Sequence, residues 1–296
     1  MEVVIAGAGA MGLLIGSYLA ESGISVSFLT RRNEQAADLI DNGVKRIHNG
    51  SVSTFRVHAF SDIAHAPKNA FWILAVKSKD LRGVVQQLEF AKLPGHLMFI
   101  QNGMRHYDLA RSVSISSVSI ASLTHGAGKV DDHTVIHNGV GVMRIAALTR
   151  NQEGSSRLFE ASSSMFPIVQ EQDAHSMLLR KAIINCCINP LTALLELKNG
   201  ELLTNITAHA LMEAVYSELA SGYPETVKTL AFSDVEKVCR NTSDNRSSML
   251  TDRDNGIPME IDTIVSAILE GKGECMPTLK VLERLLKAMD ERKDDV

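Results

Sequence analysis

The stretch that decides the fold lies at the start of the chain, where Glu2-Val-Val-Ile-Ala6 leads directly into Gly7-Ala8-Gly9-Ala10-Met11-Gly12. The first five residues are a short apolar run that ends at a glycine, which is typical of a buried strand. Residues 10–22 then have helical periodicity and stop at Gly23. The sequence therefore predicts a strand, a tight glycine turn and a helix in direct succession.

A Gly-x-Gly-x-x-Gly pattern between a strand and a helix predicts a dinucleotide-binding site, here formed by Gly7, Ala8, Gly9, Ala10, Met11 and Gly12. Gly7 allows the tight turn, Gly9 lets the backbone approach a pyrophosphate, and Gly12 lets the helix pack closely on the strand. The amides at the helix N-terminus then face the phosphates. The alternative is a glycine-rich turn without a ligand, which the flanking strand and helix disfavour.

The residues after the second strand indicate the type of cofactor. Residues 24–30 alternate in polarity and are rich in strand-forming residues, and Arg31 and Arg32 follow with no acidic residue before Glu34. An acid at this place usually bonds the ribose hydroxyls of NAD, whereas an arginine pairs with the 2′-phosphate of NADP. We therefore expect NADP(H), held by Arg31 first and by Arg32 as a helper. The alternative is a pair of solvated surface arginines.

Strand and helix signals alternate through the first half of the chain. Apolar runs at residues 70–76 and 97–100 predict further buried strands, and residues 113–123 and 134–145 look like later ones. This alternation predicts an α/β fold with an N-terminal Rossmann-like, doubly wound parallel sheet that has helices on both faces. From about Asn151 onward helical patterns dominate. We expect a Rossmann-like domain at residues 1–170 and an all-helical C-terminal domain at residues 171–296.

The composition argues against several classes of protein. Of the 296 residues, 45% are hydrophobic and 22% are charged, as in ordinary globular proteins, and the formal net charge of −4 disfavours nucleic acid as the main partner. The four cysteines show no metal-binding spacing, so we expect neither a disulfide framework nor a metal site. The apolar N-terminal stretch contains Glu2 and several glycines, which argues against a signal peptide or a membrane span. We expect a cytoplasmic protein.

Further motifs point to one family. They are Gln101-Asn102-Gly103-Met104, Thr124-His125-Gly126-Ala127, Lys181-x-x-x-Asn185-x-x-x-Asn189-Pro190, Asn245-Arg246-Ser247-Ser248-Met249-Leu250 and Glu260-Ile261-Asp262. With the glycine motif they make nearly the whole chain resemble the ketopantoate reductases, or 2-dehydropantoate 2-reductases. That family reduces 2-dehydropantoate to pantoate with NADPH, on the route to pantothenate and coenzyme A. One departure is Met259, where the family often has threonine before the glutamate.

The helix that carries Lys181, Asn185 and Asn189, together with the Ser-Ser-Met and Glu-Ile-Asp motifs that follow it, is much more specific than the glycine motif. The i, i+4, i+8 spacing of Lys181, Asn185 and Asn189 places all three on one face of a helix. A polar stripe on an otherwise apolar helix is costly to bury without partners, which favours a ligand-binding role over a solvated helix edge. The two amides can bond a hydroxyl and a carboxylate, and the lysine can donate a proton to a ketone oxygen.

The resemblance implies roles for residues in both halves of the chain. It makes Lys181 the general acid and Glu260 an acid close to both the cofactor and the reacting centre. It makes the second domain the substrate-binding domain, with Asn185, Asn189, Asn199 and Ser248 as the substrate-binding residues. It assigns Lys77, Asn102 and Ala127 to the cofactor, together with the glycine motif and Arg31. His125 is a weaker candidate for a proton carrier, since buried histidines often simply pack.

Two other functions remain open at this stage. The first is a reductase for another branched 2-oxo acid, because the expected site residues recognise only a carboxylate, a ketone and a hydroxyl. The second is a non-catalytic NADP-binding regulatory protein, which the presence of both Lys181 and Glu260 disfavours. The partner is in each case a small molecule. The helical half of the chain could also support a homodimer.

Overall fold

The computed structural model describes residues 2–149 and 153–291 of the chain. It divides into two compact units, Met1–Gln101 with His106–Met177, and Asn102–Arg105 with Leu178–Val296. The first unit is mixed α/β and the second is helical, which confirms the expected fold class. Asn151, where the sequence changes to helical patterns, lies outside the described residues. The domain boundary near residue 170 stays a prediction.

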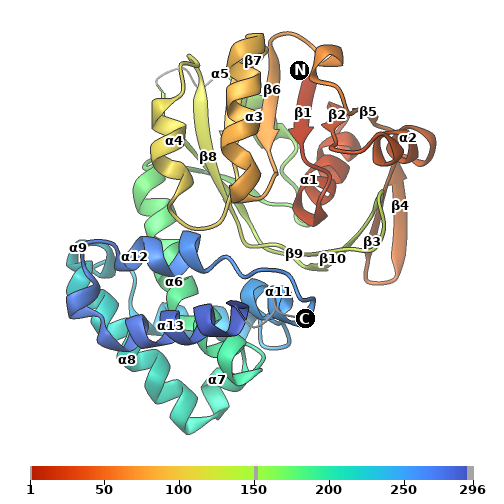
Figure 1. Cartoon of the computed structure of the whole chain (residues 1–296). Helices are drawn as coiled ribbons and strands as arrows, with labels where there is room; N and C mark the ends of the chain where they lie inside the picture. The colour runs from red at the N-terminus through yellow and green to blue at the C-terminus, as the bar shows by residue number, and fades with distance from the viewer. Residues whose placement is uncertain (1, 150–152, 292–296) are drawn as a thin grey trace. The chain divides into compact units, whose positions relative to one another are not determined.

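The described part of the first unit contains an eight-stranded sheet with the order β12-β11-β8-β7-β6-β1-β2-β5 (Figure 1). Neighbouring strands are parallel except for β8 and β11, which are antiparallel. The strands are β1 (Glu2–Ala6), β2 (Ser25–Leu29), β5 (His58–Phe60), β6 (Ala70–Leu74), β7 (Pro94–Phe99), β8 (Val118–Leu123), β11 (Met143–Ala147) and β12 (Ile168–Glu171). The helices are α1 (Ala10–Glu21), α2 (Asn33–Asn42), α3 (Ser78–Ala91), α4 (His106–Ser112) and α5 (Glu153–Glu160).

A second, four-stranded sheet was not expected from the sequence. Its order is β4 (Ser51–Phe55), β3 (Val44–His48), β10 (Thr134–Gly139) and β9 (Gly126–Lys129). Asn49 and Gly50 have φ values of 48° and 78° between β3 and β4, and an Asn-Gly pair in this conformation is a strong hairpin signal. The stretch 134–145 is therefore split between two sheets, because β10 pairs with β3 and β9 while β11 pairs with β8.

Helix α1 explains the unusually apolar N-terminus. It contacts β1 and β2 of the large sheet and β3, β9 and β10 of the small sheet (Figure 1). Residues 12–19 are all buried. A helix that is apolar on every side is expected where protein covers it all round, so this composition reflects a position between two sheets.

The second unit is built from helices of unequal length. They are α6 (Ala174–Leu195), which begins at the end of the first unit, and α7 (Glu201–Thr204), α8 (Ile206–Gly222), α9 (Pro224–Val227), α10 (Phe232–Asn241), α11 (Ser248–Asp254), α12 (Ala267–Leu269) and α13 (Pro277–Glu291). A π-helical turn occupies Asp262–Ser266. By length and composition α6 could cross a membrane, but 67% of its apolar window is buried inside the protein, as in the core helix of a soluble domain.

Candidate functional site

The glycine motif forms the expected turn between β1 and α1. Gly7 has φ +105°, and its N–H donates to the carbonyl of Leu29 at 2.9 Å. A Cβ at this position would lie 2.9 Å from the carbonyl oxygen of Ala75. Gly12 packs directly against the Gly7 carbonyl. Both positions therefore require glycine for a local steric reason, as the sequence predicted.

The start of α1 fits a phosphate group. Gly9 is the N-cap residue, and because it has no side chain, no side-chain hydrogen bond caps the N–H groups of the first turn. Among the described residues, no atom outside the adjoining backbone would lie within 4 Å of a Cβ at Gly9, whereas Gly7 in the same turn is tightly enclosed. Exposed amides at a helix N-terminus attract negative charge. The turn therefore leaves room and backbone donors where a pyrophosphate is expected.

Three candidate cofactor residues share one edge of the large sheet. Gly7 follows β1, Arg31 follows β2 and Lys77 follows β6, and these strands are parallel neighbours. The carboxyl ends of parallel strands form the edge at which ligands of open α/β sheets bind. Arg31 is exposed and makes no ion pair or hydrogen bond with any described residue. Lys77 is exposed at the N-cap of α3.

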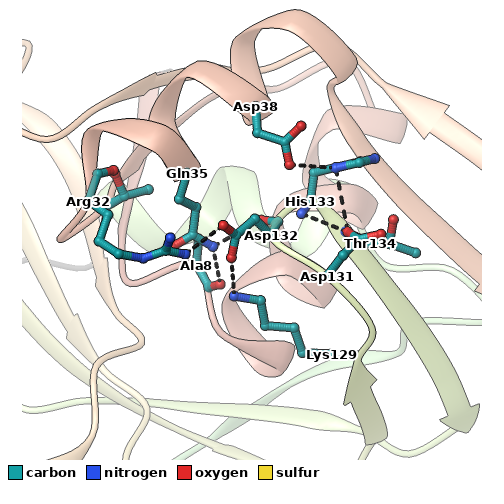
Figure 2. Close-up of polar contacts among 10 residues, drawn as sticks. Ala8, Arg32, Gln35, Asp38, Lys129, Asp131, Asp132, His133 and Thr134 are labelled. Carbon is teal, nitrogen blue, oxygen red and sulfur yellow. Dashed lines mark hydrogen bonds and ion pairs between the residues drawn. The ribbon is translucent and has the colours of Figure 1, made fainter.

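Arg32 differs from Arg31 because it already has a partner. Its guanidinium lies 2.5 Å from the carboxylate of Asp132, which also pairs with Lys129 Nζ at 3.0 Å (Figure 2). Gln35 donates from Nε2 to the carbonyls of Ala8 and Asp132, each at 2.9 Å. The turn between β9 and β10 thus lies beside the glycine motif, which the sequence analysis did not anticipate.

Ala127 and His125 lie on and beside β9. Ala127 pairs with His137 across the β9–β10 ladder. His125 is buried, and its Nδ1 accepts from the N–H of Gly141 at 3.0 Å and lies 3.1 Å from Nε2 of His137. Desolvation and the neighbouring His137 lower the pKa of His125 to about 4. A neutral, enclosed imidazole at pH 7 is a packing residue rather than a proton donor.

The second unit brings Lys181, Asn102 and Glu260 together. Lys181 Nζ donates to Asn102 Oδ1 at 2.9 Å, and Asn102 Nδ2 donates to Glu260 Oε2 at 3.2 Å. The lysine can only donate and the ionised glutamate can only accept, so the chemistry of the two partners sets the orientation of the amide. Desolvation lowers the pKa of Lys181 to about 8, and the charge of Glu260 opposes this shift. Asn102, expected among the cofactor residues, therefore contacts both residues expected at the reacting centre.

Gly103 explains how Asn102 reaches this position. It has φ +76°, and a Cβ there would overlap the carbonyl of Thr263. The next residue, Met104, donates its N–H to the same carbonyl at 3.0 Å. Thr263 belongs to the π-helical turn that begins two residues after Glu260. The Asn-Gly-Met sequence therefore holds the amide of Asn102 against the segment that carries the glutamate.

The expected substrate residues fall into two groups. Asn185 lies half-buried on α6 without a partner among the described residues, and Asn189 is buried with Nδ2 at 3.4 Å from the exposed Ser248 hydroxyl. Asn199 is also buried, but its amide donates to Thr242 Oγ1 at 2.9 Å, and it has no described contact with the Lys181 cluster. Asn185, Asn189 and Ser248 could therefore present polar atoms together, whereas a substrate-binding role for Asn199 stays a prediction.

The sequence analysis missed Gln35, Lys129 and Asp132, and gave no structural reason for Gly103. Gln35 and Asp132 carried no local signal, because each acts through a residue far away in the chain. The left-handed position of Gly103 could have been suspected from the Asn-Gly pair. No group of three or more metal-ligating side chains occurs within residues 2–149 and 153–291.

The first unit has a dinucleotide-type turn, and the helical unit has a cluster of lysine, asparagine and glutamate. These features are typical of two-domain oxidoreductases that use a nicotinamide cofactor. Comparison with known proteins agrees with this architecture. The family model described as ketopantoate reductase PanE/ApbA matches residues 3–150, and the model of its C-terminal domain matches residues 173–290. The chain therefore belongs to the ketopantoate reductase family.

Individual relatives cover almost the whole chain. A 2-dehydropantoate 2-reductase of Bacillus subtilis (strain 168) is 35% identical over 91% of this chain and 90% of its own length. One of Listeria innocua is 34% identical over 98% of this chain and 97% of its own length. The crystal structure of a probable 2-dehydropantoate 2-reductase from Bacillus subtilis superposes with a TM-score of 0.86 at 32% identity, covering 98% of this chain and 100% of that one. A D-mandelate dehydrogenase with NADH and anilino(oxo)acetate, at 23% identity and a TM-score of 0.85 over 99% of each chain, shares the fold.

Proposed function

We propose that this protein reduces 2-dehydropantoate to pantoate with NADPH as the hydride donor. The observation that carries the proposal is the chain of hydrogen bonds from Lys181 through Asn102 to Glu260. It places a cationic donor of lowered pKa beside a carboxylate in a half-buried setting, which suits proton transfer to a developing alkoxide. Membership of the family supports the choice of substrate.

The residues of the first unit fit a nicotinamide dinucleotide. The open glycine turn and the amides of α1 suit its pyrophosphate, and Arg31, which has no partner among the described residues, suits a 2′-phosphate. Lys77, on the neighbouring strand end, adds positive charge at the same edge, and Ala127 offers backbone groups to the nicotinamide half. When bound, the cofactor supplies a hydride to the ketone carbon.

The residues of the second unit then account for the proton and for the orientation of the substrate. At pH 7 a lysine with a pKa of about 8 is mostly protonated, so Nζ of Lys181 holds the proton that the ketone oxygen takes up. The ketone carbon gains hydride and its oxygen gains this proton, which yields the 2-hydroxy acid. Asn185, Asn189 and Ser248 orient the carboxylate and hydroxyl of the substrate. Asn102 and Glu260 keep Lys181 in place and in its charged form.

The test is NADPH oxidation by the purified protein with 2-dehydropantoate, set beside other branched 2-oxo acids. We expect the highest kcat/KM with 2-dehydropantoate and almost none for the Lys181→Ala variant. A higher kcat/KM with another branched 2-oxo acid would assign the protein to a sibling reductase. Binding of NADPH without turnover of any 2-oxo acid would instead point to a regulatory protein. The proposed reaction belongs to pantothenate and coenzyme A biosynthesis and to the cytoplasm.

A further inference from the structure

The carboxylate of Asp132 lies between two cations beside the glycine motif. In Figure 2 both Arg32 and Lys129 point to this carboxylate. The Arg32 guanidinium lies 2.5 Å from Oδ2 and Lys129 Nζ lies 3.0 Å from Oδ1. The Arg32 guanidinium, followed by Lys129, lowers the pKa of Asp132, so the carboxylate is charged at neutral pH. One negative charge is thus shared by two positive ones.

The turn that carries Asp132 is held firmly in place. The Asp131 carboxylate accepts from the N–H groups of His133 at 3.0 Å and Thr134 at 2.6 Å, which closes the turn. His133 Nδ1 lies 2.7 Å from Asp38 Oδ2 on α2. Asp132 is therefore presented by an ordered turn that is anchored to the helix following Arg32, and its pairing with Arg32 does not depend on a mobile loop.

The position of this turn relative to the glycine motif is also set. Nε2 of Gln35 donates to the main-chain carbonyls of both Ala8 and Asp132 (Figure 2). Ala8 lies within the motif where a pyrophosphate is expected, and Arg32 follows the strand end where the adenosine ribose is expected. Asp132 therefore stands at the place where a 2′-phosphate would approach the arginines.

Arg31 and Arg32 differ in what they offer to such a phosphate. Arg31 has no partner among the described residues, whereas Arg32 is already paired. A phosphate monoester carries a charge of about −1.5 to −2 at pH 7, which exceeds that of a carboxylate. It can compete with Asp132 for Arg32 and Lys129, but it also approaches the negative charge of Asp132 itself.

We propose that Asp132 is a specificity-determining counter-ion, which competes with the 2′-phosphate of the cofactor for Arg32 and Lys129. The proposal rests on the proposed use of NADP(H). In this scheme Arg31 provides the first contact with the phosphate, and Arg32 and Lys129 contribute only to the extent that Asp132 releases them. Asp132 thus reduces the preference for NADPH over NADH below what three free cations would produce.

The experiment is calorimetric binding of two nucleotides that differ by one phosphate, adenosine 2′,5′-bisphosphate and adenosine 5′-monophosphate, to the full chain. Asp132→Asn keeps the side-chain shape and the carbonyl that Gln35 uses. Because exposed ion pairs are individually weak, we expect the bisphosphate to bind about three- to thirtyfold more tightly to this variant, with the monophosphate changed less than about twofold. The gain should shrink at high salt.

Two further variants isolate the cause. Asp41→Asn removes an equal charge from an exposed position of α2, away from the described contacts of Arg32, Lys129 and the turn of Asp132, and should leave the ratio of the two affinities unchanged. Asp132→Asn combined with Arg32→Ala should lose most of the gain. Thermal unfolding followed by the fluorescence of Trp72, the single tryptophan of the chain, checks that the first unit remains folded.

The outcomes separate this inference from the proposed function. If the wild-type protein prefers the bisphosphate and Asp132→Asn does not increase that preference, the inference is overturned and NADP(H) use stands. If the wild-type protein is indifferent and Asp132→Asn creates a preference, the role of Asp132 stands and NADP(H) use falls. If neither protein distinguishes the nucleotides, both fail.

Discussion

Each unit contains a cation, a carboxylate and a side-chain amide, but they are connected in different orders. In the first unit Arg32 contacts Asp132 directly, and the amide of Gln35 binds only main-chain carbonyls. In the second unit the amide of Asn102 accepts a hydrogen bond from Lys181 and donates one to Glu260. The same three kinds of group therefore form a direct ion pair in one unit and a chain of hydrogen bonds through an amide in the other.

The difference has a direct effect on proton affinity. Direct pairing raises the pKa of Arg32 and lowers that of Asp132, so both charges persist throughout the physiological range. In the second unit desolvation outweighs the attraction of Glu260, and the pKa of Lys181 falls to about 8. A solvent-exposed ion pair suits the recognition of fixed charge, whereas a desolvated lysine suits the transfer of a proton.

The largest effect on kcat should come from removing Lys181. Lys181→Ala should lower kcat with 2-dehydropantoate by about 10²- to 10⁴-fold, the usual contribution of a positioned general acid. NADPH binding, measured by calorimetry, should be nearly unchanged, because the expected cofactor residues lie mostly in the first unit. A variant with near wild-type kcat would contradict the assignment of Lys181 as the proton donor.

The first unit should respond in the opposite way. Arg31→Ala should weaken NADPH binding by about 10- to 150-fold, the range for a hydrogen bond to a charged group, and leave NADH binding nearly unchanged. The kcat at saturating NADPH should stay close to that of the wild-type protein. An equal loss for both cofactors would show that the phosphate lies elsewhere.

The pH profile tests the lysine without a mutation. Reduction requires the protonated form of Lys181, so kcat should be level below pH 8 and fall about tenfold per unit above it. Asn102→Asp places a carboxylate beside Nζ of Lys181. The fall in kcat should then begin at a higher pH, because a negative neighbour favours the charged amine. If kcat falls at the same pH in the variant, a group other than Lys181 sets the pH dependence.

The amides of α6 should have smaller and unequal effects. Asn185→Ala should raise KM for the 2-oxo acid several-fold, by roughly the 0.5–1.5 kcal/mol of one hydrogen bond, without changing the stability. Asn189→Ala should raise KM similarly but also lower the melting temperature, because its buried amide contacts Ser248. Steady-state kinetics and calorimetry would check both. Loss of NADPH binding with retained 2-oxo acid binding would show that this face of α6 has been misassigned.

The last prediction concerns the acid stability of the first unit. Burial lowers the pKa of His96, His125 and His137 to about 4, below the unfolded value of about 6.5. The unfolded state therefore binds more protons in this window, and the free energy of unfolding should fall as the pH drops from 6.5 to 4.

Fluorescence of Trp72 in urea titrations would report this dependence for the first unit. His137→Gln should make it shallower, whereas His65→Gln, at an exposed position of the same unit, should serve as the unchanged control. A steeper dependence in His137→Gln would reverse the sign of the argument. Amide hydrogen exchange in the second unit, measured over the same pH range, would show whether its stability depends on pH in the same way.

Local patterns were sufficient for much of the molecule. The β1–glycine–α1 succession, the alternation of strands and helices, and the one-sided stripe of Lys181, Asn185 and Asn189 all follow from periodicity and glycine geometry. The small sheet was missed because short strands such as β9 and β10 have their partners in distant segments. Their pairing depends on tertiary contacts rather than on local propensity.

By itself, the sequence determined that a dinucleotide-type turn opens the chain and that a lysine and two amides share one helix face, because these features depend on neighbouring residues alone. Tertiary structure decided which charges meet. Arg32 and Asp132 are 100 residues apart, and Asn102 is 79 residues from Lys181 and 158 from Glu260. Whether a cation is neutralised by a partner or desolvated depends on such encounters, and local periodicity carries no information about them.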